Sequence, residues 1–192
     1  MWRSANQTGA VNKTSHKKRR NKESMPQKRK RWAMRQMLTE QPEASPWSAR
    51  PISQQDGPLL GKLMYDAYHG TIDDEGETPE EALKEIEGTL AGKYGPLLST
   101  CSFLVEDQGR VLAASVLTDW TNERTGREQP LLTFLMTHPD TKGKGMATFL
   151  LKKSINALLA LGEKELVLFV TVGNNAAQHI YQKIGFQVEE EF

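Results

Sequence analysis

The most informative stretch of this 192-residue sequence is THPDTKGKGMA, residues 137–147. An apolar, strand-like segment ends here, and two glycines, Gly143 and Gly145, come before a pattern typical of a helix. Glycine lets backbone N–H groups crowd around an anion, and a helix N-terminus adds about half a positive charge. The stretch therefore predicts a phosphate-binding loop to which Lys142 and Lys144 add positive charge. An ordinary glycine-containing connection is the alternative.

Two familiar phosphate-binding motifs do not fit this loop. Met146 follows Gly145, where a P-loop would continue with Lys and then Ser or Thr. A dinucleotide-binding loop needs a third glycine, which residues 146–148 lack. The ligand is therefore expected to carry phosphate groups but to belong to another class.

On both sides of the loop, the spacing of apolar residues predicts alternating helices and strands. The second helix has a start signature in residues 78–81, with Thr78 as N-cap and Glu81 completing a capping box. Residues 107–110 predict the turn of a hairpin. The expected helices are 59–67, 83–90, 147–158 and 177–184, and the expected strands are 49–53, 101–106, 111–120, 131–137, 166–172 and 186–190. This order indicates an α/β fold with a mixed antiparallel and parallel sheet and helices on both faces.

A second informative stretch is VTVGNNAAQHIYQKIGF, residues 170–186. Asn174 is placed to cap a short helix, and Ala177 permits a close approach of the chain. Tyr181 follows Asn174 by seven residues, two helical turns along the same side. It is therefore placed to present its hydroxyl to a pocket. The alternative is a core tyrosine whose hydroxyl is bonded to the backbone.

Taken together, the two stretches resemble the GNAT superfamily of N-acetyltransferases over residues 50–192. The acetyl-CoA loop of that superfamily reads Arg/Gln-x-x-Gly-x-Gly/Ala, and residues 142–147 match it with Lys142 in place of Arg or Gln. The later segment, with Asn, Ala and Tyr before Gly-Phe, is matched by Asn174, Ala177, Tyr181 and residues 185–186. The resemblance implies the GNAT fold of acyl-CoA N-acyltransferases and acetyl-CoA as co-substrate, with no metal.

The resemblance also implies roles for individual residues. The pantetheine arm of acetyl-CoA would pair with the strand before the loop, and the pyrophosphate would accept from the N–H groups of residues 143–147. A backbone N–H near Met136 would polarise the thioester carbonyl, and Tyr181 would protonate the leaving thiolate. The implied catalytic residues are Tyr181 and Met136, and the implied acetyl-CoA-binding residues are Leu135, Met136, Thr137, Lys142, Gly143, Lys144, Gly145, Met146, Ala147 and Asn174.

Neither the general base nor the amine acceptor follows from the motifs. Candidates for the base are Glu128, His138 and the acidic loop at residues 73–77. In this superfamily the equivalent region often borders the acceptor site, so the loop would attract a cationic amine. A solvated loop and a turn histidine are the alternatives. His69 and His179 have no Cys or second His at metal-ligand spacing.

The balance of charged residues differs between the beginning of the chain and the rest of it. Residues 1–50 carry 13 Lys and Arg against three acidic residues, whereas residues 51–192 carry 12 against 21. Residues 1–47 are almost free of aliphatic side chains, so we expect a disordered basic tail before a GNAT domain at 48–192. The tail suits a nucleic-acid contact, a nuclear address or a mitochondrial presequence, and an inert tail or sequence upstream of the natural start remains as an alternative.

The rest of the composition excludes some protein classes. A single Cys excludes an internal disulfide framework, and no apolar run approaches the roughly 18 residues of a membrane span. The first 30 residues contain no apolar signal-peptide core. We therefore expect a cytoplasmic protein with no membrane partner.

The chain reaches Phe192 only six residues after Phe186, where the superfamily usually continues into a hairpin with a final strand. We expect either a shorter sheet or a homodimer in which the partner supplies the missing edge. Three hypotheses for function remain. The first is an acetyl-CoA-dependent N-acetyltransferase acting on a primary amine, the second is a non-catalytic acyl-CoA-binding or regulatory module, and the third is a nucleic-acid or ribosome-associated protein acting through its basic tail.

Overall fold

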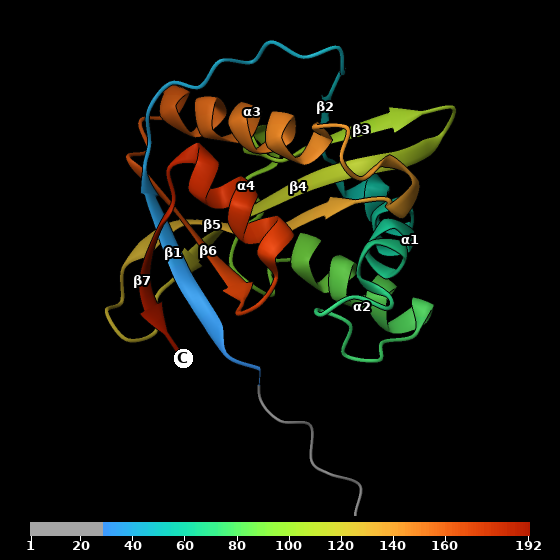
Figure 1. Cartoon of the computed structure of the whole chain (residues 1–192), viewed down its shortest axis with the longest axis horizontal. Helices are drawn as coiled ribbons and strands as arrows, with labels where there is room; N and C mark the ends of the chain where they lie inside the picture. Colours follow the sequence, from blue (N-terminus) through green and yellow to red (C-terminus); the bar gives the residue numbers. More distant parts are fainter. Residues whose placement is uncertain (1–28) are drawn as a thin grey trace, which may run out of the picture.

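A seven-stranded mixed sheet runs through the molecule, with strand order β2-β3-β4-β5-β6-β1-β7 (Figure 1). The computed structural model describes residues 29–192. Neighbouring strands are antiparallel except for β5 and β6, which are parallel. The strands are β1 (Arg31–Met37), β2 (Arg50–Pro51), β3 (Phe103–Asp107), β4 (Arg110–Thr121), β5 (Glu128–Thr137), β6 (Glu165–Thr171) and β7 (Gln187–Glu191). The α-helices are α1 (Gly57–Tyr68), α2 (Pro79–Leu90), α3 (Met146–Ala160) and α4 (Asn175–Ile184).

Each helix and strand predicted from apolar spacing is present, and the mixed α/β sheet is confirmed. The local signals work as expected. At the start of α2 the Thr78 hydroxyl accepts from the Glu81 N–H at 3.2 Å, and the Glu81 carboxylate accepts from the Thr78 N–H at 2.9 Å. The β3–β4 hairpin turns through Gln108 and Gly109, both at positive φ. Predicted capping and turn residues therefore fix where these elements begin and end.

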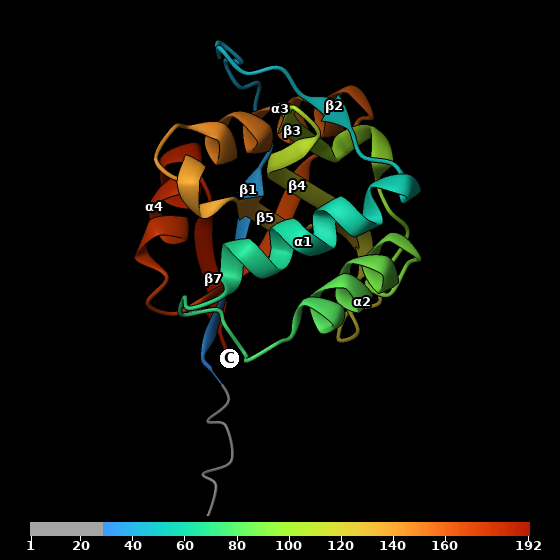
Figure 2. The ribbon, with the colours of Figure 1, turned by 90° about the vertical axis from the view of Figure 1, so that its right-hand side faces the viewer.

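The helices divide the core between the two faces of the sheet (Figures 1 and 2). Apolar residues of α1 and α2 pack on one face, chiefly against β4 and β5. Those of α3 and α4 pack on the other, where the core includes residues of β1 and of β3 to β6. Within residues 29–192, no helix combines the length and the apolar character that crossing a bilayer requires.

The prediction of a disordered tail over residues 1–47 is wrong from Arg31 onward. Residues 31–37 form β1, which pairs with β6 on one side and β7 on the other, although β1 lies more than 120 residues before both in sequence (Figure 1). Met34 is fully buried, and Gln36 donates to the Ile184 carbonyl at 2.8 Å. Composition averaged over 47 residues hid one short strand among charged neighbours. Residues 1–28 lie outside the described part of the chain.

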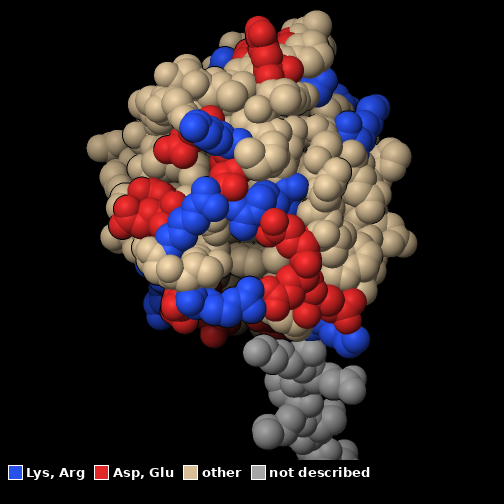
Figure 3. Space-filling view, turned by 90° about the vertical axis from the view of Figure 1, so that its left-hand side faces the viewer, with Lys and Arg blue, Asp and Glu red and all other residues tan. Residues whose placement is uncertain are grey.

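The strand β1 also completes the part of the sheet that the sequence led us to expect to be missing. It occupies the space between β6 and β7 and pairs with both along its length. Within residues 29–192, β1 thus fills the part of the sheet that was expected to be missing or to come from a partner subunit. The outer strand β7 carries charged side chains, and Lys and Arg atoms lie beside Asp and Glu atoms on this face (Figure 3). Arg35 pairs with Glu189 at 2.6 Å and Arg124 with Glu190 at 2.7 Å. Such charges discourage a flat edge from recruiting another strand.

Candidate active site

The strands β5 and β6 separate part of the way along the sheet. They pair only at Leu131–Val167 and Leu132–Leu168. Immediately after this point, Thr133 is the extra residue of a bulge against β4. A bulge bends the strand that carries it, so β5 turns away from β6 while keeping its ladder with β4. A V-shaped opening results between residues 133–137 and the end of β6.

Backbone alternation decides which N–H groups face this opening. The His138 N–H donates to the Leu112 carbonyl on the β4 side at 2.8 Å. Because N–H directions alternate along a strand, Met136 also faces β4, opposite Ala114. The N–H groups of Leu135 and Thr137 point the other way, into the opening. Of the backbone N–H groups at and beside Met136, those of Leu135 and Thr137 are therefore the ones that face the opening.

The glycine loop has the backbone geometry that the sequence predicted. Gly143 and Gly145 have φ of +79° and +81°, a region that side chains with a Cβ rarely adopt. Gly145 is the N-cap of α3, and the first helical bond runs from the Phe149 N–H to the Gly145 carbonyl at 2.9 Å. The N–H groups of residues 143–148 donate to no backbone carbonyl in the described chain. They form an unfilled set of donors at a helix N-terminus, which suits a phosphate group.

A hollow of about 480 Å³, the glycine-loop cleft, lies between this loop, the end of β5, α1 and α4. Of the residues expected to bind the co-substrate, all but one line it, namely Leu135, Met136, Thr137, Lys142, Gly143, Gly145, Met146, Ala147 and Asn174. Lys142 also reaches the Ala67 carbonyl at the end of α1, at 3.4 Å. Tertiary structure thus brings both sequence stretches to one cavity.

Lys144 does not line the glycine-loop cleft. Its carbonyl accepts from the Trp47 indole N–H at 3.1 Å. Trp47 packs beside a cluster that contains Phe103 and Met146. This hydrogen bond holds one carbonyl of the loop. Sequence reasoning missed Trp47 because it lies almost a hundred residues before the loop, in a segment assigned to the tail.

A second hollow of about 710 Å³, the acidic cleft, continues from the first. Its walls come from β1, α1, the 73–77 loop, α2, β5, β6 and α4. The carboxylates Asp73, Glu75, Glu77, Glu81 and Glu85 line it together with Arg31, Lys84 and Lys93. The two clefts share Tyr68, Asp73, Leu135, Asn174, Ala177 and Tyr181. The site therefore has two halves that meet at one group of residues.

Tyr181 stands where the two clefts meet. Its ring is 7% exposed and lies 5.8 Å from the Phe186 ring, centroid to centroid. The Tyr181 hydroxyl makes no hydrogen bond to another described residue, so the alternative of a core tyrosine bonded to the backbone does not apply within residues 29–192. Burial, and then the negative charge of Asp73, raise the pKa of this phenol above its ordinary value. Tyr181 is therefore a neutral donor across the physiological pH range.

Asp73 is the one carboxylate of the described residues that lines both clefts. Its carboxylate accepts a hydrogen bond from the side-chain NH2 group of Asn174 at 2.7 Å, and the side-chain oxygen of Asn174 accepts one from the Ala177 N–H at 3.1 Å. Asn174 thus both caps α4 and orients Asp73. The neighbouring Asp74 has a local role, since it accepts from the N–H groups of Gly70 and Gly76, and these bonds lower the pKa of its carboxyl.

The two other candidates for the base do not face the site. Glu128 stands at the opposite end of β5, paired with Thr121. His138 caps the turn after β5, where its side chain accepts from the Asp140 N–H and contacts Arg110. Neither residue lines either cleft. Interpreting His138 as a turn residue fits the structure, and of the three candidates only the acidic loop lines a cleft.

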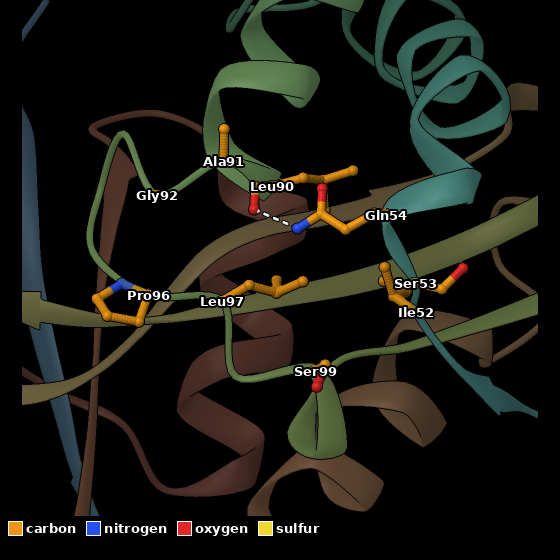
Figure 4. Close-up of a pocket in the computed structure, with 9 residues that line it drawn as sticks. All are labelled: Ile52, Ser53, Gln54, Leu90, Ala91, Gly92, Pro96, Leu97 and Ser99. Atoms are coloured by element: carbon orange, nitrogen blue, oxygen red, sulfur yellow. Dashed lines mark hydrogen bonds between the residues drawn. The ribbon is translucent and has the colours of Figure 1, made fainter.

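A third hollow of about 440 Å³ lies apart from both clefts, where the segment after β2 meets the end of α2 (Figure 4). The Gln54 side chain points across it and donates to the Leu90 carbonyl at 2.6 Å. This third hollow shares no lining residue with the glycine-loop cleft or the acidic cleft. Gln54 therefore ties the start of α1 to the end of α2, and this hollow contributes nothing to the site.

Comparison with known proteins agrees with this architecture. The model of the acetyltransferase (GNAT) family matches residues 58–186. No curated protein is similar enough in sequence to match. A GCN5-related N-acetyltransferase from Sphaerobacter thermophilus is similar in structure, with 18% identity, a TM-score of 0.62, and coverage of 85% of this chain and 49% of that one. This chain thus spans about half the length of that protein.

Two further solved structures have the same fold. The Salmonella typhimurium protein yncA, solved with its cofactor acetyl-CoA, is 20% identical, with a TM-score of 0.57 over 76% of this chain and 82% of that one. An aminoglycoside 6'-N-acetyltransferase from Acinetobacter haemolyticus is 16% identical, with a TM-score of 0.56 over 74% and 93%. Two-thirds of the sequence matches the family model. The chain belongs to the acetyltransferase (GNAT) family.

Proposed function

We propose that this protein transfers the acetyl group of acetyl-CoA to a primary amine. The observation that carries the proposal is the meeting of two clefts at Tyr181, one built around an anion-binding loop and the other lined by carboxylates. The first half suits a phosphate-bearing donor, and the second suits a cationic acceptor. Transfer between two substrates needs such a junction, where their reacting groups can be held within contact distance.

The residues of the glycine-loop cleft fit acetyl-CoA. The free N–H groups of residues 143–148 are positioned for the pyrophosphate, and Gly143 and Gly145, both at positive φ, have no Cβ that could stand in its way. The free edge of β5 at Leu135 and Thr137 offers hydrogen bonds to the amides of the pantetheine arm. When bound, acetyl-CoA supplies an acetyl thioester whose carbonyl carbon accepts the amine. Lys142 keeps positive charge where the family usually has Arg or Gln.

Three groups of this chain would then act on the reaction. The Leu135 N–H, which points into the opening between β5 and β6, donates a hydrogen bond to the thioester carbonyl oxygen of acetyl-CoA. This bond stabilises the negative charge that develops on that oxygen during attack by the amine. The Tyr181 hydroxyl donates a proton to the leaving sulfur. Asp73, held by Asn174, takes the proton that the ammonium group of the acceptor must lose, either directly or through a water molecule. The structure supports Asp73 over Glu128 and His138 because only Asp73 lines both clefts.

Calorimetric titration of the full chain with acetyl-CoA and with desulfo-CoA tests the donor site. Screening amines by release of the CoA thiol then tests transfer. We expect micromolar binding of both ligands and thiol release with at least one cationic amine. Binding without turnover of any amine would favour the non-catalytic acyl-CoA-binding alternative. Absence of binding would refute the proposal. The full chain is needed because β1 is part of the sheet.

A further inference from the structure

The chain enters the fold beside the acidic cleft. Arg31, the first residue of β1, lines this cleft and pairs with Glu75 at 3.2 Å. Arg29 donates to the Asp74 carbonyl, and the Lys30 carbonyl accepts from the Val172 N–H at 2.9 Å. These contacts fix residues 29–31 between the acidic loop and the end of β6. The segment before Arg29 is therefore joined to the fold beside the acceptor half of the site.

Charge complementarity relates that segment to the cleft. Residues 1–28 carry eight basic residues against one acidic residue, and five of the eight are lysines, namely Lys13, Lys17, Lys18, Lys22 and Lys28. The cleft has five carboxylates and three basic side chains, and two of the latter are already paired, Arg31 with Glu75 and Lys93 with Glu85. An excess of negative charge therefore faces the attachment point of a strongly basic segment.

We infer that the acidic cleft receives the chain's own segment of residues 1–28, and that Lys22 or Lys28 is an acetyl acceptor in the same molecule. This inference rests on the proposed function. Because residues 29–31 are held by their contacts with the acidic loop and the end of β6, the free span is counted from Arg29. Lys28 is one residue and Lys22 seven residues before Arg29, and a chain spans at most about 4 Å and 25 Å over those lengths. Tethering gives the lysines an effective concentration in the millimolar range, so even weak affinity fills the cleft.

Asp73, Tyr181 and solvent together account for every proton that moves during acetyl transfer to the lysine. The lysine ammonium first loses a proton to Asp73, and the neutral Nζ attacks the carbonyl carbon of acetyl-CoA. An N–C bond forms as the C–S bond breaks, and the nitrogen gives up its second proton to solvent. The sulfur takes a proton from the Tyr181 hydroxyl, which solvent then restores. One acetyl-CoA and one lysine ammonium give one acetyl-lysine, one CoA thiol and one proton released to solvent. The product has lost its positive charge and so binds the acidic cleft less well, which allows release.

The first experiment incubates the full chain with isotopically labelled acetyl-CoA and maps the label by mass spectrometry. We expect label on Lys22 or Lys28, with a labelled fraction per unit time that does not change when the protein is diluted thirtyfold. The double variant Lys22→Arg, Lys28→Arg should lose this label yet still release thiol with spermidine as a free amine. Desulfo-CoA in excess should suppress the label, which separates it from chemical acetylation in solution.

The second experiment needs no acetyl-CoA. A zero-length carbodiimide cross-linker joins a lysine amine to a carboxylate in contact with it. We expect cross-links from Lys22 or Lys28 to Glu75 or Glu77, weakened by salt and reduced several-fold by Glu77→Gln. The matched control Glu163→Gln changes an exposed carboxylate outside both clefts and should leave the cross-links unchanged.

The outcomes separate this inference from the proposed function. Spermidine turnover with no label on residues 1–28 would overturn the inference and leave the proposed function intact. Label whose rate rises with protein concentration would also overturn it, since transfer would then occur between molecules. Failure of acetyl-CoA to bind would overturn both. Label on the lysines without any cross-link to the acidic loop would refute the docking step.

Discussion

Removing the hydroxyl of Tyr181 tests the proposed chemistry most directly. The Tyr181→Phe variant takes away one oxygen and leaves the ring, which packs 5.8 Å from Phe186 between centroids. Because no described residue is hydrogen-bonded to that hydroxyl, its loss leaves no buried partner unsatisfied. We therefore expect the free energy of unfolding to change by less than about 1 kcal/mol. The variant should fold and should bind acetyl-CoA with nearly unchanged affinity, because the loop and the β5 edge are untouched.

The expected effect falls on the turnover number. Burial and the charge of Asp73 raise the pKa of Tyr181, so the phenol keeps its proton at neutral pH and can give it to a leaving thiolate. General acid catalysis typically contributes a factor of roughly 10² to 10⁴. We expect kcat to fall at least tenfold, which corresponds to about 1.4 kcal/mol of transition-state free energy.

Thiol release under saturating acetyl-CoA gives kcat, and calorimetry gives the affinity for acetyl-CoA. A large drop in kcat at constant affinity supports the role of a general acid. An unaltered kcat would refute the reasoning and make Tyr181 a packing residue. A fall in affinity together with a lower free energy of unfolding would show that the hydroxyl supports the structure instead.

Three further groups of the site and one ion pair of the fold yield predictions. Gly145→Val forces a β-branched residue to φ of +81° and puts methyl groups before the helix N-terminus, so calorimetry should show at least a tenfold loss of acetyl-CoA affinity. Asp73→Asn should lower kcat/KM for spermidine more than tenfold at neutral pH, with acetyl-CoA affinity retained; unchanged kcat/KM would exclude Asp73 as the base. Trp47→Phe removes the bond to the loop carbonyl, and should weaken acetyl-CoA binding severalfold while kcat at saturation stays unchanged. The Arg50 ion pair lowers the pKa of buried Asp56 to about 2, so Asp56→Asn should cost at most about 2 kcal/mol in urea unfolding at neutral pH. Because the folded pKa is the lower one, that difference should be present above pH 4 and vanish as the pH falls toward 2; a constant difference would contradict it.

Much of the fold could be predicted because its signals are local. The capping box at Thr78, the turn at Gly109 and the end of α4 at Gly185 each depend on the conformation of a few consecutive residues. The continuous apolar sequence of β6 likewise indicates a buried strand without reference to the rest of the chain. The strand β1 could not be predicted in this way. Its seven residues, RWAMRQM, show no regular alternation of polar and apolar side chains and lie among basic neighbours. Only the space between β6 and β7 makes them a strand.

The residues of the candidate site also divide into those that local sequence signals predict and those that only the tertiary structure brings to the site. Gly143, Gly145 and Asn174 were predicted from the sequence because a positive φ or a helix start restricts which residue can stand there. Tyr181 was predicted from its place in the motif, two helical turns after Asn174. Trp47 carries no such signal, and it reaches the loop only through the packing of the segment before β2. The choice of Asp73 among the acidic residues also needed the fold, because neighbouring carboxylates in one loop have the same chemistry and differ only in direction.

The sequence by itself determined the order of helices and strands from residue 49 onward and the position of the glycine loop, since these rest on short-range periodicity and on backbone conformations that single residues impose. Its two motifs also carried the resemblance to the family. Only the tertiary structure decided that β1 completes the sheet and that the bulge at Thr133 opens β5 from β6. It also decided that the Leu135 N–H, rather than that of Met136, faces the opening, and that the basic segment joins the fold at the acidic cleft. These features depend on pairing and contact between residues far apart in the chain, where one change of register or direction reverses which groups meet.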